Sequence, residues 1–270
     1  QLASCIKDLA VEIKGYNFIY VDVEDLDITD EQAVGSFFKL NKPSWCINCA
    51  AYTAVDKAET DFELAKNVNV NGTKYLARAS KKYKSKLIQI STDFVFDGIK
   101  GSICTEENPI SVYGGTKLEG EQVTIDEVNE HFILRTSWLY SEHGNNFLKT
   151  MLNLGSERNE LSVVCDQIGT PTYAGDLAEL IVKLIKSDSI AYGLYHFSNE
   201  GVASWYDFTM AIFDLAKVDC KVLPINTDGY PTPAKRPSFS VMDKSKIKST
   251  FNIEIPYWRD SLKKCLEILE

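Results

Sequence analysis

The sequence predicts an α/β protein built on a doubly wound parallel sheet, followed by a smaller C-terminal lobe. Short apolar runs alternate with amphipathic stretches along most of the chain. Strands separated by helices of about a dozen residues or more are typical of right-handed βαβ units. The apolar runs are continuous rather than alternating, which is expected where helices cover both faces of a sheet.

This alternation assigns most of the chain to individual elements. Strands are expected at 17–23, 44–51, 86–96, 131–140, 161–166 and 193–199. Helices are expected at 1–13, 27–43, 60–84, 112–130, 145–156 and 175–187, the second with Thr29 or Asp30 as its N-cap. Five of the eight prolines fall in the last 70 residues, which predict a loop-rich lobe with two or three helices.

Composition narrows the class of protein. Hydrophobic residues make up 44% of the chain and charged residues 25%, as in ordinary globular proteins. No run of about 18 apolar residues predicts a membrane span, and the net charge of −9 argues against nucleic acid as a partner. Seven scattered cysteines favour reduced thiols in a cytoplasmic protein over a disulfide framework: they stand at 5, 46, 49, 104, 165, 220 and 265.

Tyr113 and Lys117 stand four residues apart in an expected helix, and so lie on one face of it. A free tyrosine has a pKa of about 10, and a nearby ammonium lowers that pKa because it stabilises the phenolate. The spacing alone is commonplace on the solvent face of a helix. The spacing favours a proton-transfer site more strongly because Ser91 and Thr92 end the preceding expected strand. They offer a hydroxyl to the same substrate oxygen that the tyrosine would protonate.

Ligands of an open parallel sheet bind beyond the carboxyl ends of the strands. Asp22 and Asp27 follow the first expected strand. An acid at that place accepts hydrogen bonds from an adenosine ribose, or else serves as a turn or cap residue. Ala50 and Ala51 follow the second expected strand, where two small side chains permit either the close approach of a flat ligand or tight packing.

Seven sequence blocks occur in a recognisable order. They are NCAAYTAVDKAE (48–59), STDFVFDG (91–98), VYGGTKLEGE (112–121), RTSWLY (135–140), GNNF (144–147), DQIGTPT (166–172) and YPTPAKRP (230–237). A serine or threonine after a strand, followed by YxxxK, resembles the short-chain dehydrogenase/reductase superfamily. The full series resembles the dTDP-4-dehydrorhamnose reductase family in its extended, nucleotide-sugar branch.

The resemblance implies a Rossmann-type fold and NADPH- or NADH-dependent reduction of the C4 keto group of dTDP-4-dehydro-6-deoxy-L-mannose to dTDP-L-rhamnose. It makes Tyr113 the proton donor, Lys117 the residue that lowers its pKa and binds the nicotinamide ribose, and Thr92 the partner of the carbonyl oxygen. The implied substrate-binding residues are Thr92, Asp93, Tyr113 and Trp138. The implied cofactor-binding residues are Asp22, Asp27, Ile28, Ala50, Ala51, Tyr52, Thr53, Ser91, Tyr113 and Lys117.

Two departures from the family pattern stand out. Gln1-Leu2-Ala3 resembles the tail of the glycine-rich phosphate loop, with Ala3 in place of the last glycine. We therefore expect the first strand and that loop to be missing before Gln1. Phe94 replaces the family's tyrosine two residues after the threonine, which removes one hydroxyl from the sugar site. Asp22 argues weakly against a 2′-phosphate, and the sequence leaves the choice between NADPH and NADH open.

The sequence offers little support for a metal site. The CxxC pair of Cys46 and Cys49 falls inside an expected strand, where residues three apart point to opposite faces. Buried thiols are the better interpretation. His131, His143 and His196 have no ligand spacing, so no histidine metal site is expected. The resemblance allows Mg²⁺ bound by carboxylates, but no ligand set maps onto the sequence.

By this interpretation, residues 1–140 and 166–200 form the dinucleotide-binding domain, and 141–165 and 201–270 form the substrate-binding lobe. The expected partner is a small nucleotide sugar, and the sequence leaves open whether the chain forms a homodimer. One alternative function is another extended-branch enzyme, such as a nucleotide-sugar epimerase. The other is a non-catalytic regulatory subunit of the same fold, against which the intact set of Tyr113, Lys117 and Thr92 argues.

Overall fold

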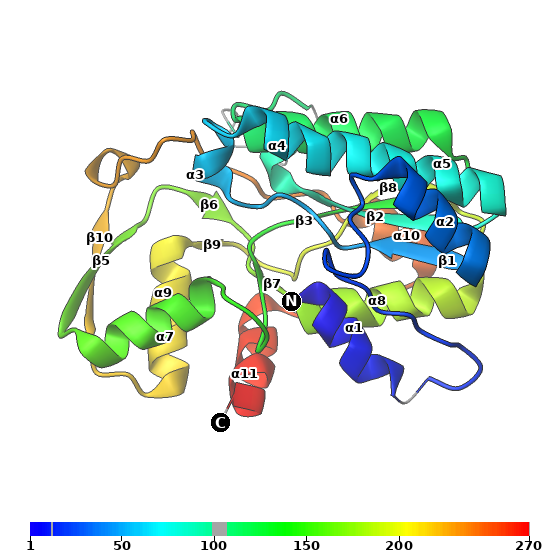
Figure 1. Cartoon of the computed structure of the whole chain (residues 1–270). Coiled ribbons are helices and arrows are strands. Elements are labelled where there is room, and N and C mark those ends of the chain that lie inside the picture. Colours follow the sequence, from blue (N-terminus) through cyan, green and yellow to red (C-terminus); the bar gives the residue numbers. More distant parts are fainter. Residues whose placement is uncertain (12, 99–106, 270) are drawn as a thin grey trace.

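The computed structural model describes residues 1–11, 13–98 and 107–269, so Cys104 lies outside the described residues. Its centre is a parallel sheet of four strands in the order β1-β2-β3-β8 (Figure 1). The strands are β1 (Trp45–Asn48), β2 (Lys86–Thr92), β3 (His131–Thr136) and β8 (Gly193–His196). Because all four run the same way, their carboxyl ends meet at one edge of the sheet, with Thr92 of β2 paired with Thr136 of β3.

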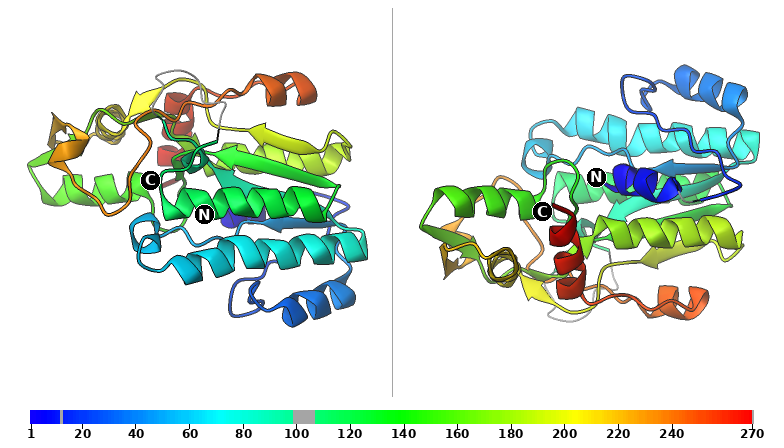
Figure 2. Two further views of the ribbon diagram at one scale, coloured as in Figure 1. Left: turned by 90° about the horizontal axis from the view of Figure 1, so that it is seen from above. Right: turned by 90° about the horizontal axis from the view of Figure 1, so that it is seen from below.

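Helices cover both faces of this sheet, and the predicted doubly wound, Rossmann-type α/β arrangement is confirmed (Figures 1 and 2). One face carries α5 (Thr73–Tyr83) and α6 (Val112–Glu127), with α2 (Glu31–Asn41) packed outside α5. The other carries α1 (Leu2–Ala10) and α8 (Ala174–Ser187), which lie side by side. Apolar residues of α1 and α8 form one core with residues of β2, β3 and β8, and α10 (Ser245–Phe251) also contributes to this core.

A second apolar core lies beside the sheet. It joins α7 (Phe147–Glu157), α9 (Trp205–Ala216) and α11 (Trp258–Leu269) to the parallel pair β5 (Glu160–Val164) and β10 (Lys221–Ile225). Two short pairs connect this region to the sheet: β4 (Leu139–Tyr140) with β7 (Thr172–Tyr173), and β6 (Ile168–Gly169) with β9 (Ala203–Ser204). The last 70 residues thus contain three described helices, as the sequence predicted.

The strand predicted at 17–23 is wrong. These residues form no strand and leave apolar side chains in solvent, with Ile19 49% exposed and Val23 73% exposed. A strand is stabilised by hydrogen bonds to a neighbouring strand, and within the described residues β1 pairs with β2 alone. An apolar run can therefore predict a strand correctly only where the fold supplies a partner for it.

Three other elements are shorter or more divided than expected. The helix predicted at 60–84 consists of α4 (Phe62–Lys66), the π-helix η1 (Asn67–Gly72) and α5. The strand predicted at 86–96 ends at Thr92, where the 3₁₀ turn η2 (Asp93–Val95) begins. The strand predicted at 131–140 is interrupted by Trp138, whose φ of 48° lies in the left-handed region.

The N-cap of α2 is Asp30, whose carboxylate accepts from the backbone N–H groups of Gln32 and Ala33.

Two glycines let α6 pack closely against its neighbours. A Cβ on Gly114 would lie 2.1 Å from the backbone oxygen of Phe94 in η2, and a Cβ on Gly120 would lie 2.4 Å from that of Asn69 in η1. Both oxygens belong to backbone, which cannot rotate away as a flexible side chain can. Glycine at these positions therefore sets how near α6 comes to the end of β2.

The adjacent glycines of α6 supply a matched test. We expect Gly114→Ala to destabilise the protein by about 1–3 kcal/mol, since overpacking forces the backbone to shift. Nothing lies within 4 Å of a Cβ on Gly115, so Gly115→Ala should leave stability unchanged or raise it by up to about 1 kcal/mol through helix propensity. Thermal and chemical unfolding of both variants measure the difference, and equal effects would contradict the packing argument.

Candidate active site

The end of β2 and the first turn of α6 bring Thr92 and Tyr113 together. The Thr92 hydroxyl accepts from the backbone N–H of Phe94 at 3.2 Å and so caps η2. Ser111 caps α6 by accepting from the backbone N–H of Gly114 at 3.1 Å. The Thr92 hydroxyl lies close enough to the Tyr113 side chain to lower its pKa, and the Tyr113 ring meets that of Phe94 edge-on, with centroids 5.5 Å apart. Two hydroxyls, one at the end of β2 and one in the first turn of α6, thus lie near each other.

Lys117 lies one turn further along α6 and is 5% exposed. Its ammonium donates to the backbone oxygen of Ile90 at 2.7 Å. Burial lowers the pKa of Lys117 to about 8, although the charge of Glu121 opposes this shift. A lysine with such a pKa exchanges protons readily near neutrality.

The expected lowering of the Tyr113 pKa by Lys117 is not found in this arrangement. Burial raises the pKa of Tyr113 to about 12, the hydrogen bond with Thr92 acts in the opposite direction, and the charge of Asp93 adds to the rise. The reason lies in the direction of the Lys117 ammonium, which binds the end of β2. The helical spacing correctly placed both residues on one face but could not fix where the ammonium points.

Asp93 connects the two hydroxyls to a cavity. It is 2% exposed, and its Oδ1 accepts from the Thr92 hydroxyl at 3.2 Å. Burial raises the pKa of this carboxyl to about 6, against the effect of hydrogen bonds with Ser240 and Thr92. Asp93 therefore titrates in a range where enzymes operate, next to the candidate proton donor.

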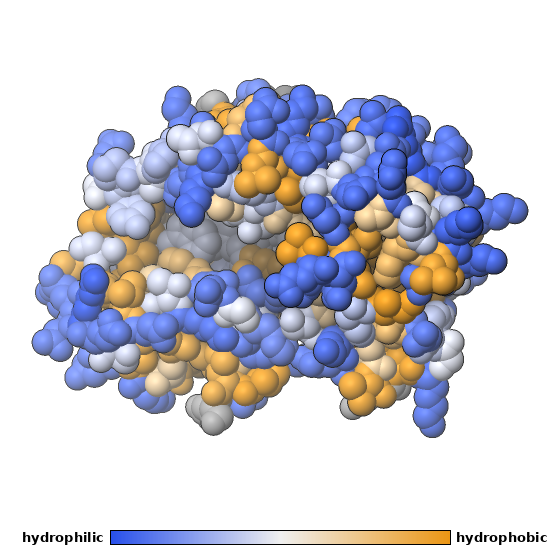
Figure 3. Space-filling model, viewed as in Figure 1, coloured by the Kyte–Doolittle hydropathy of each residue, from blue (hydrophilic) through white to orange (hydrophobic). Residues whose placement is uncertain are grey.

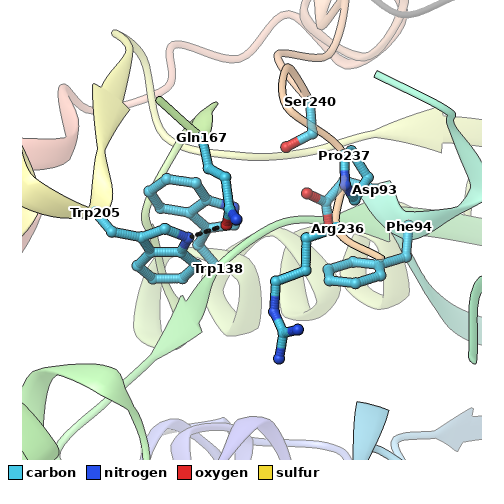
Figure 4. Close-up of a pocket in the computed structure, with 8 residues that line it drawn as sticks. All are labelled: Asp93, Phe94, Trp138, Gln167, Trp205, Arg236, Pro237 and Ser240. Atoms are coloured by element: carbon cyan, nitrogen blue, oxygen red, sulfur yellow. Dashed lines mark hydrogen bonds between the residues drawn. The ribbon is translucent and has the colours of Figure 1, made fainter. Parts of the chain in front are cut away.

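The surface is hollowed between α3 (Val55–Ala58) and α9 (Figures 1 and 3). The cavity drawn in Figure 4 has a volume of about 40 Å³. Its lining residues are Asp93, Phe94, Trp138, Gln167, Trp205, Arg236, Pro237 and Ser240. The indoles of Trp138 and Trp205 stack face to face, with ring centroids 3.6 Å apart and planes 7° apart. Aromatic faces of this kind suit the apolar face of a deoxysugar.

The backbone around Trp138 explains how its indole reaches this position. Its left-handed φ turns the chain sharply between β3 and β4, and a Cβ on Gly169 would lie 2.6 Å from the indole. Gln167 accepts from the indole N–H of Trp205 at 3.2 Å. A strained residue held in this way is often part of a binding site.

Arg236 joins the loop 230–237 to the region after β1. Its guanidinium donates two hydrogen bonds to the Asp56 carboxylate, at 3.1 and 2.8 Å. The backbone N–H of Ala234 donates to the same carboxylate at 3.1 Å. These bonds tie α3 to the C-terminal loop that lines the cavity.

The expected cofactor-binding residues occupy two places. Ala50, Ala51, Tyr52 and Thr53 follow β1 at the carboxyl edge of the sheet. Asp22 and Asp27 are exposed, and their carboxylates accept hydrogen bonds within their own loops, from Glu24 and Thr29 respectively. Ile28 packs against Gly72 of η1.

Ser91 differs from the other expected cofactor-binding residues because its hydroxyl is already engaged by Glu121. Glu121, 2% exposed, also accepts from the Arg135 guanidinium at 2.9 and 2.6 Å. Arg135 pairs in addition with Glu107 at 2.9 Å. This buried network braces α6 against β2 and β3.

Asn69 is a residue of the site that the sequence analysis missed. It lies in η1, is 2% exposed, and accepts from the backbone N–H of Tyr52 at 2.9 Å. Its amide donates to the backbone oxygen of Tyr52 at 3.3 Å and to the Thr116 hydroxyl at 3.0 Å. It therefore holds the loop after β1 against α6. A π-helical turn, which often marks a functional site, leaves no sign in the sequence.

Trp205, Gln167 and Arg236 were also not assigned to the site from the sequence. Gln167 and Arg236 fall inside the quoted blocks DQIGTPT and YPTPAKRP, so those blocks carried the available signal. Trp205 begins α9, and a tryptophan at a helix start is not by itself a sign of binding.

The described residues contain one group of three potential metal ligands: Cys5, Glu142 and His143. Mg²⁺ prefers oxygen ligands in octahedral geometry, and a thiol and an imidazole do not suit it. The Mg²⁺ that the resemblance allowed therefore does not fit this group, and no step of the chemistry below uses it.

The raised pKa of Asp93 predicts a pH-dependent stability. The folded state favours the protonated Asp93 carboxyl. The contribution of this preference to the free energy of unfolding is therefore complete below about pH 4 and is lost as the pH rises through about 6. The shift corresponds to about 3 kcal/mol. Relative to wild type, Asp93→Asn should gain that amount between about pH 4 and pH 7 in chemical unfolding. Asp219→Asn, an exposed change in the α9–β10 loop, is the control, and a pH-independent difference for Asp93→Asn would refute the prediction.

Known proteins match this chain over almost its whole length. The model of the family described as RmlD substrate binding domain matches residues 1–270. A dTDP-4-dehydrorhamnose reductase of Aggregatibacter actinomycetemcomitans is 44% identical over 277 aligned positions, which cover 97% of this chain and 94% of that protein.

Two solved structures are similar over almost the whole chain. A dTDP-4-dehydrorhamnose reductase of Clostridium acetobutylicum superposes with a TM-score of 0.96 at 44% identity, covering 100% of this chain and 96% of that one. The enzyme of Bacillus anthracis, solved in complex with NADP, gives a TM-score of 0.95 at 39% identity, covering 99% and 95%. The chain therefore belongs to the RmlD substrate-binding-domain family, the family of the dTDP-4-dehydrorhamnose reductases.

Proposed function

We propose that this protein reduces the C4 keto group of dTDP-4-dehydro-6-deoxy-L-mannose to give dTDP-L-rhamnose, with NADPH or NADH as reductant. The observation that carries the proposal is the convergence of the Tyr113 and Thr92 hydroxyls beside a cavity walled by two stacked indoles. Relatives of that activity at 39–44% identity support it.

The residues divide the work of the reaction. A reduced nicotinamide, when bound, would supply a hydride to C4, which would place negative charge on the C4 oxygen. Thr92 holds that oxygen with a hydrogen bond aimed where the charge develops. Tyr113 donates the proton that completes the hydroxyl. Lys117, with a pKa of about 8, is suited to return a proton to Tyr113 between turnovers.

The pKa of Tyr113, raised to about 12 by burial, suits a proton donor that stays neutral until the reaction calls for its proton. The expected phenolate-stabilising role of Lys117 requires its ammonium, which has three donors, to reach the Tyr113 oxygen together with or instead of the backbone oxygen of Ile90. We assign that rearrangement to the ternary complex. The flexible four-carbon side chain of a lysine gives its ammonium the freedom for such a change.

The cofactor is proposed to lie along the carboxyl edge of the sheet, across Ala50, Ala51, Tyr52 and Thr53. The Bacillus anthracis relative is described with NADP, which favours NADPH for this chain, whereas Asp22 argues weakly for NADH. Residues 1–140 and 166–200 are proposed to bind the dinucleotide, and 141–165 and 201–270 the sugar nucleotide. The separate core of α7, α9 and α11 supports this division, except at α10, which belongs to 201–270 but packs in the core of the sheet.

Two further predictions stay open. A cytoplasmic location is expected from the sequence, and a homodimer is a possibility that the sequence leaves open; neither is needed for the chemistry. Among helices within residues 1–11, 13–98 and 107–269, none combines the length and the apolar character needed to cross a membrane.

Tyr113→Phe tests the proton donor. We expect kcat to fall by about 10²–10⁴-fold, because the general acid is lost, while the Kd for the reduced cofactor changes little. Tyr192→Phe is the matched control. Tyr192 lies just before β8, at the amino end of the strands and so away from the site, and its hydroxyl donates to the Glu130 carboxylate at 3.1 Å. Unchanged turnover in Tyr113→Phe would refute the assigned role.

Stoichiometry separates a reductase from an epimerase. With the purified protein, dTDP-4-dehydro-6-deoxy-L-mannose and either NADPH or NADH, we expect one reduced cofactor to be oxidised for each sugar converted. An epimerase retains its nicotinamide through turnover, so product formation without net oxidation would overturn the reductase assignment. Binding of both ligands without any turnover would favour the regulatory-subunit alternative.

A further inference from the structure

The face of α6 that meets β2 carries three polar residues, each one helical turn from the next. Tyr113, Lys117 and Glu121 follow one another at intervals of four, so they form one stripe along the helix. The first two carry the proton transfer proposed above. The third is 2% exposed and has no part in that scheme.

Lys117 and Glu121 both contact the end of β2. The Lys117 ammonium donates to the backbone oxygen of Ile90 at 2.7 Å. The Glu121 carboxylate accepts from the hydroxyl of Ser91, the next residue of that strand. Because these contacts are made to neighbouring residues of one strand, from neighbouring turns of one helix, the ammonium and the carboxylate are held side by side.

We propose that Glu121 is a positioning residue of the reaction: its carboxylate is the counter-charge that keeps the buried Lys117 ammonium protonated at the edge of the sheet. Glu121 acts through Lys117, and we assign it no contact with the sugar or the cofactor. Its role in turnover rests on the proposed function, because the charge of Lys117 matters there as a source of the proton returned to Tyr113.

The ammonium needs such a partner. Lys117 is 5% exposed, and burial lowers its pKa to about 8. Glu121 and, to a smaller extent, Cys49 oppose this lowering. Burial raises the pKa of the Cys49 thiol to about 12, so that thiol is uncharged near neutrality and Glu121 is the charged neighbour. Without this charge, Lys117 would lose its proton at a lower pH.

The charged groups on the elements packed against α6 are engaged elsewhere. Those on α3, α4, α5 and β2 form ion pairs with other partners: Asp56 with Arg236, Lys66 with Glu119, Arg78 with Glu127 and Lys86 with Asp188. The charge of Asp93 in η2 acts on Tyr113. The pair of Lys117 and Glu121 can therefore be perturbed without disturbing these contacts.

Arg135 of β3 fixes the Glu121 carboxylate from the other side. Its guanidinium donates to the two carboxylate oxygens at 2.9 and 2.6 Å, and both residues are 2% exposed. A buried ion pair gains little stability over an apolar pair of the same volume. Bracing α6 against β3 therefore does not by itself account for a buried carboxylate, whereas a counter-charge for Lys117 does.

Carbon-13 NMR of the full chain tests the proposal without any turnover. When lysine is labelled at its ε carbon, the Lys117 signal is the one that Lys117→Arg removes, and its titration gives the pKa. We expect about 8 in wild type and about one unit less in Glu121→Gln, because a charge is lost at a buried site. Glu121→Asp keeps the charge and should restore most of the difference.

Glu107→Gln is the matched control. Glu107 pairs with the same Arg135 at 2.9 Å, but its side chain is 41% exposed and its charge does not act on Lys117. This variant should leave the Lys117 pKa unchanged. Should Glu121→Gln fail to fold, the double variant Glu121→Gln/Arg135→Gln removes both buried charges together and should lower the pKa equally. An unchanged Lys117 pKa, or an equal fall in Glu107→Gln, would overturn the proposal.

The pH dependence of turnover is the second measurement. The kcat of wild type should fall as the pH rises through about 8, because Lys117 then loses the proton that it returns. In Glu121→Gln the fall should come about one unit lower, so that at pH 8 the variant keeps about one-fifth of the wild-type kcat. Identical profiles would refute the role of Glu121 in turnover. A wild type that oxidises no reduced cofactor would instead contradict the proposed function, and the NMR titration would still decide whether Glu121 is the counter-charge.

Discussion

The close approach of α6 to the end of β2 is the constraint on which the rest of the site depends. It exists because Gly114 and Gly120 carry no Cβ where the backbone oxygens of Phe94 and Asn69 come near. That approach brings the Tyr113 hydroxyl within reach of Thr92 and puts Lys117 beneath the sheet edge. A helix held further out by a methyl group would separate the two hydroxyls that define the chemistry.

Buried charge keeps this contact in place. Arg135 and Glu121, each 2% exposed, join β3 to α6 through two hydrogen bonds. Removing one partner of such a pair leaves a buried charge uncompensated, which typically costs about 3–5 kcal/mol. Asn69 holds the same region together with neutral groups, because its amide forms hydrogen bonds with the backbone of Tyr52 and with the hydroxyl of Thr116. The loop after β1, α6 and the sheet edge are therefore positioned as one unit.

The cavity shows how the C-terminal region completes a site that the sheet only begins. Asp93 and Phe94 come from the sheet edge, whereas Trp205 and Arg236 come from residues more than one hundred positions later. Trp138 links the two contributions, since it leaves β3 in a left-handed conformation and stacks on Trp205. On the proposed function, specificity for the sugar depends on how these two cores are placed relative to each other.

The sequence alone determined the order of the elements, the pairing of Tyr113 with Lys117 on one helical face, and the family. These features are local, or are written in short blocks of fixed order, so periodicity and motif were enough. Only the tertiary structure decided that residues 17–23 lack a strand partner, that Lys117 points to Ile90, and that Asn69 and Trp205 belong to the site. It alone joined Cys5 to Glu142 and His143, because contacts across more than one hundred residues arise from packing and leave no regular spacing in the chain.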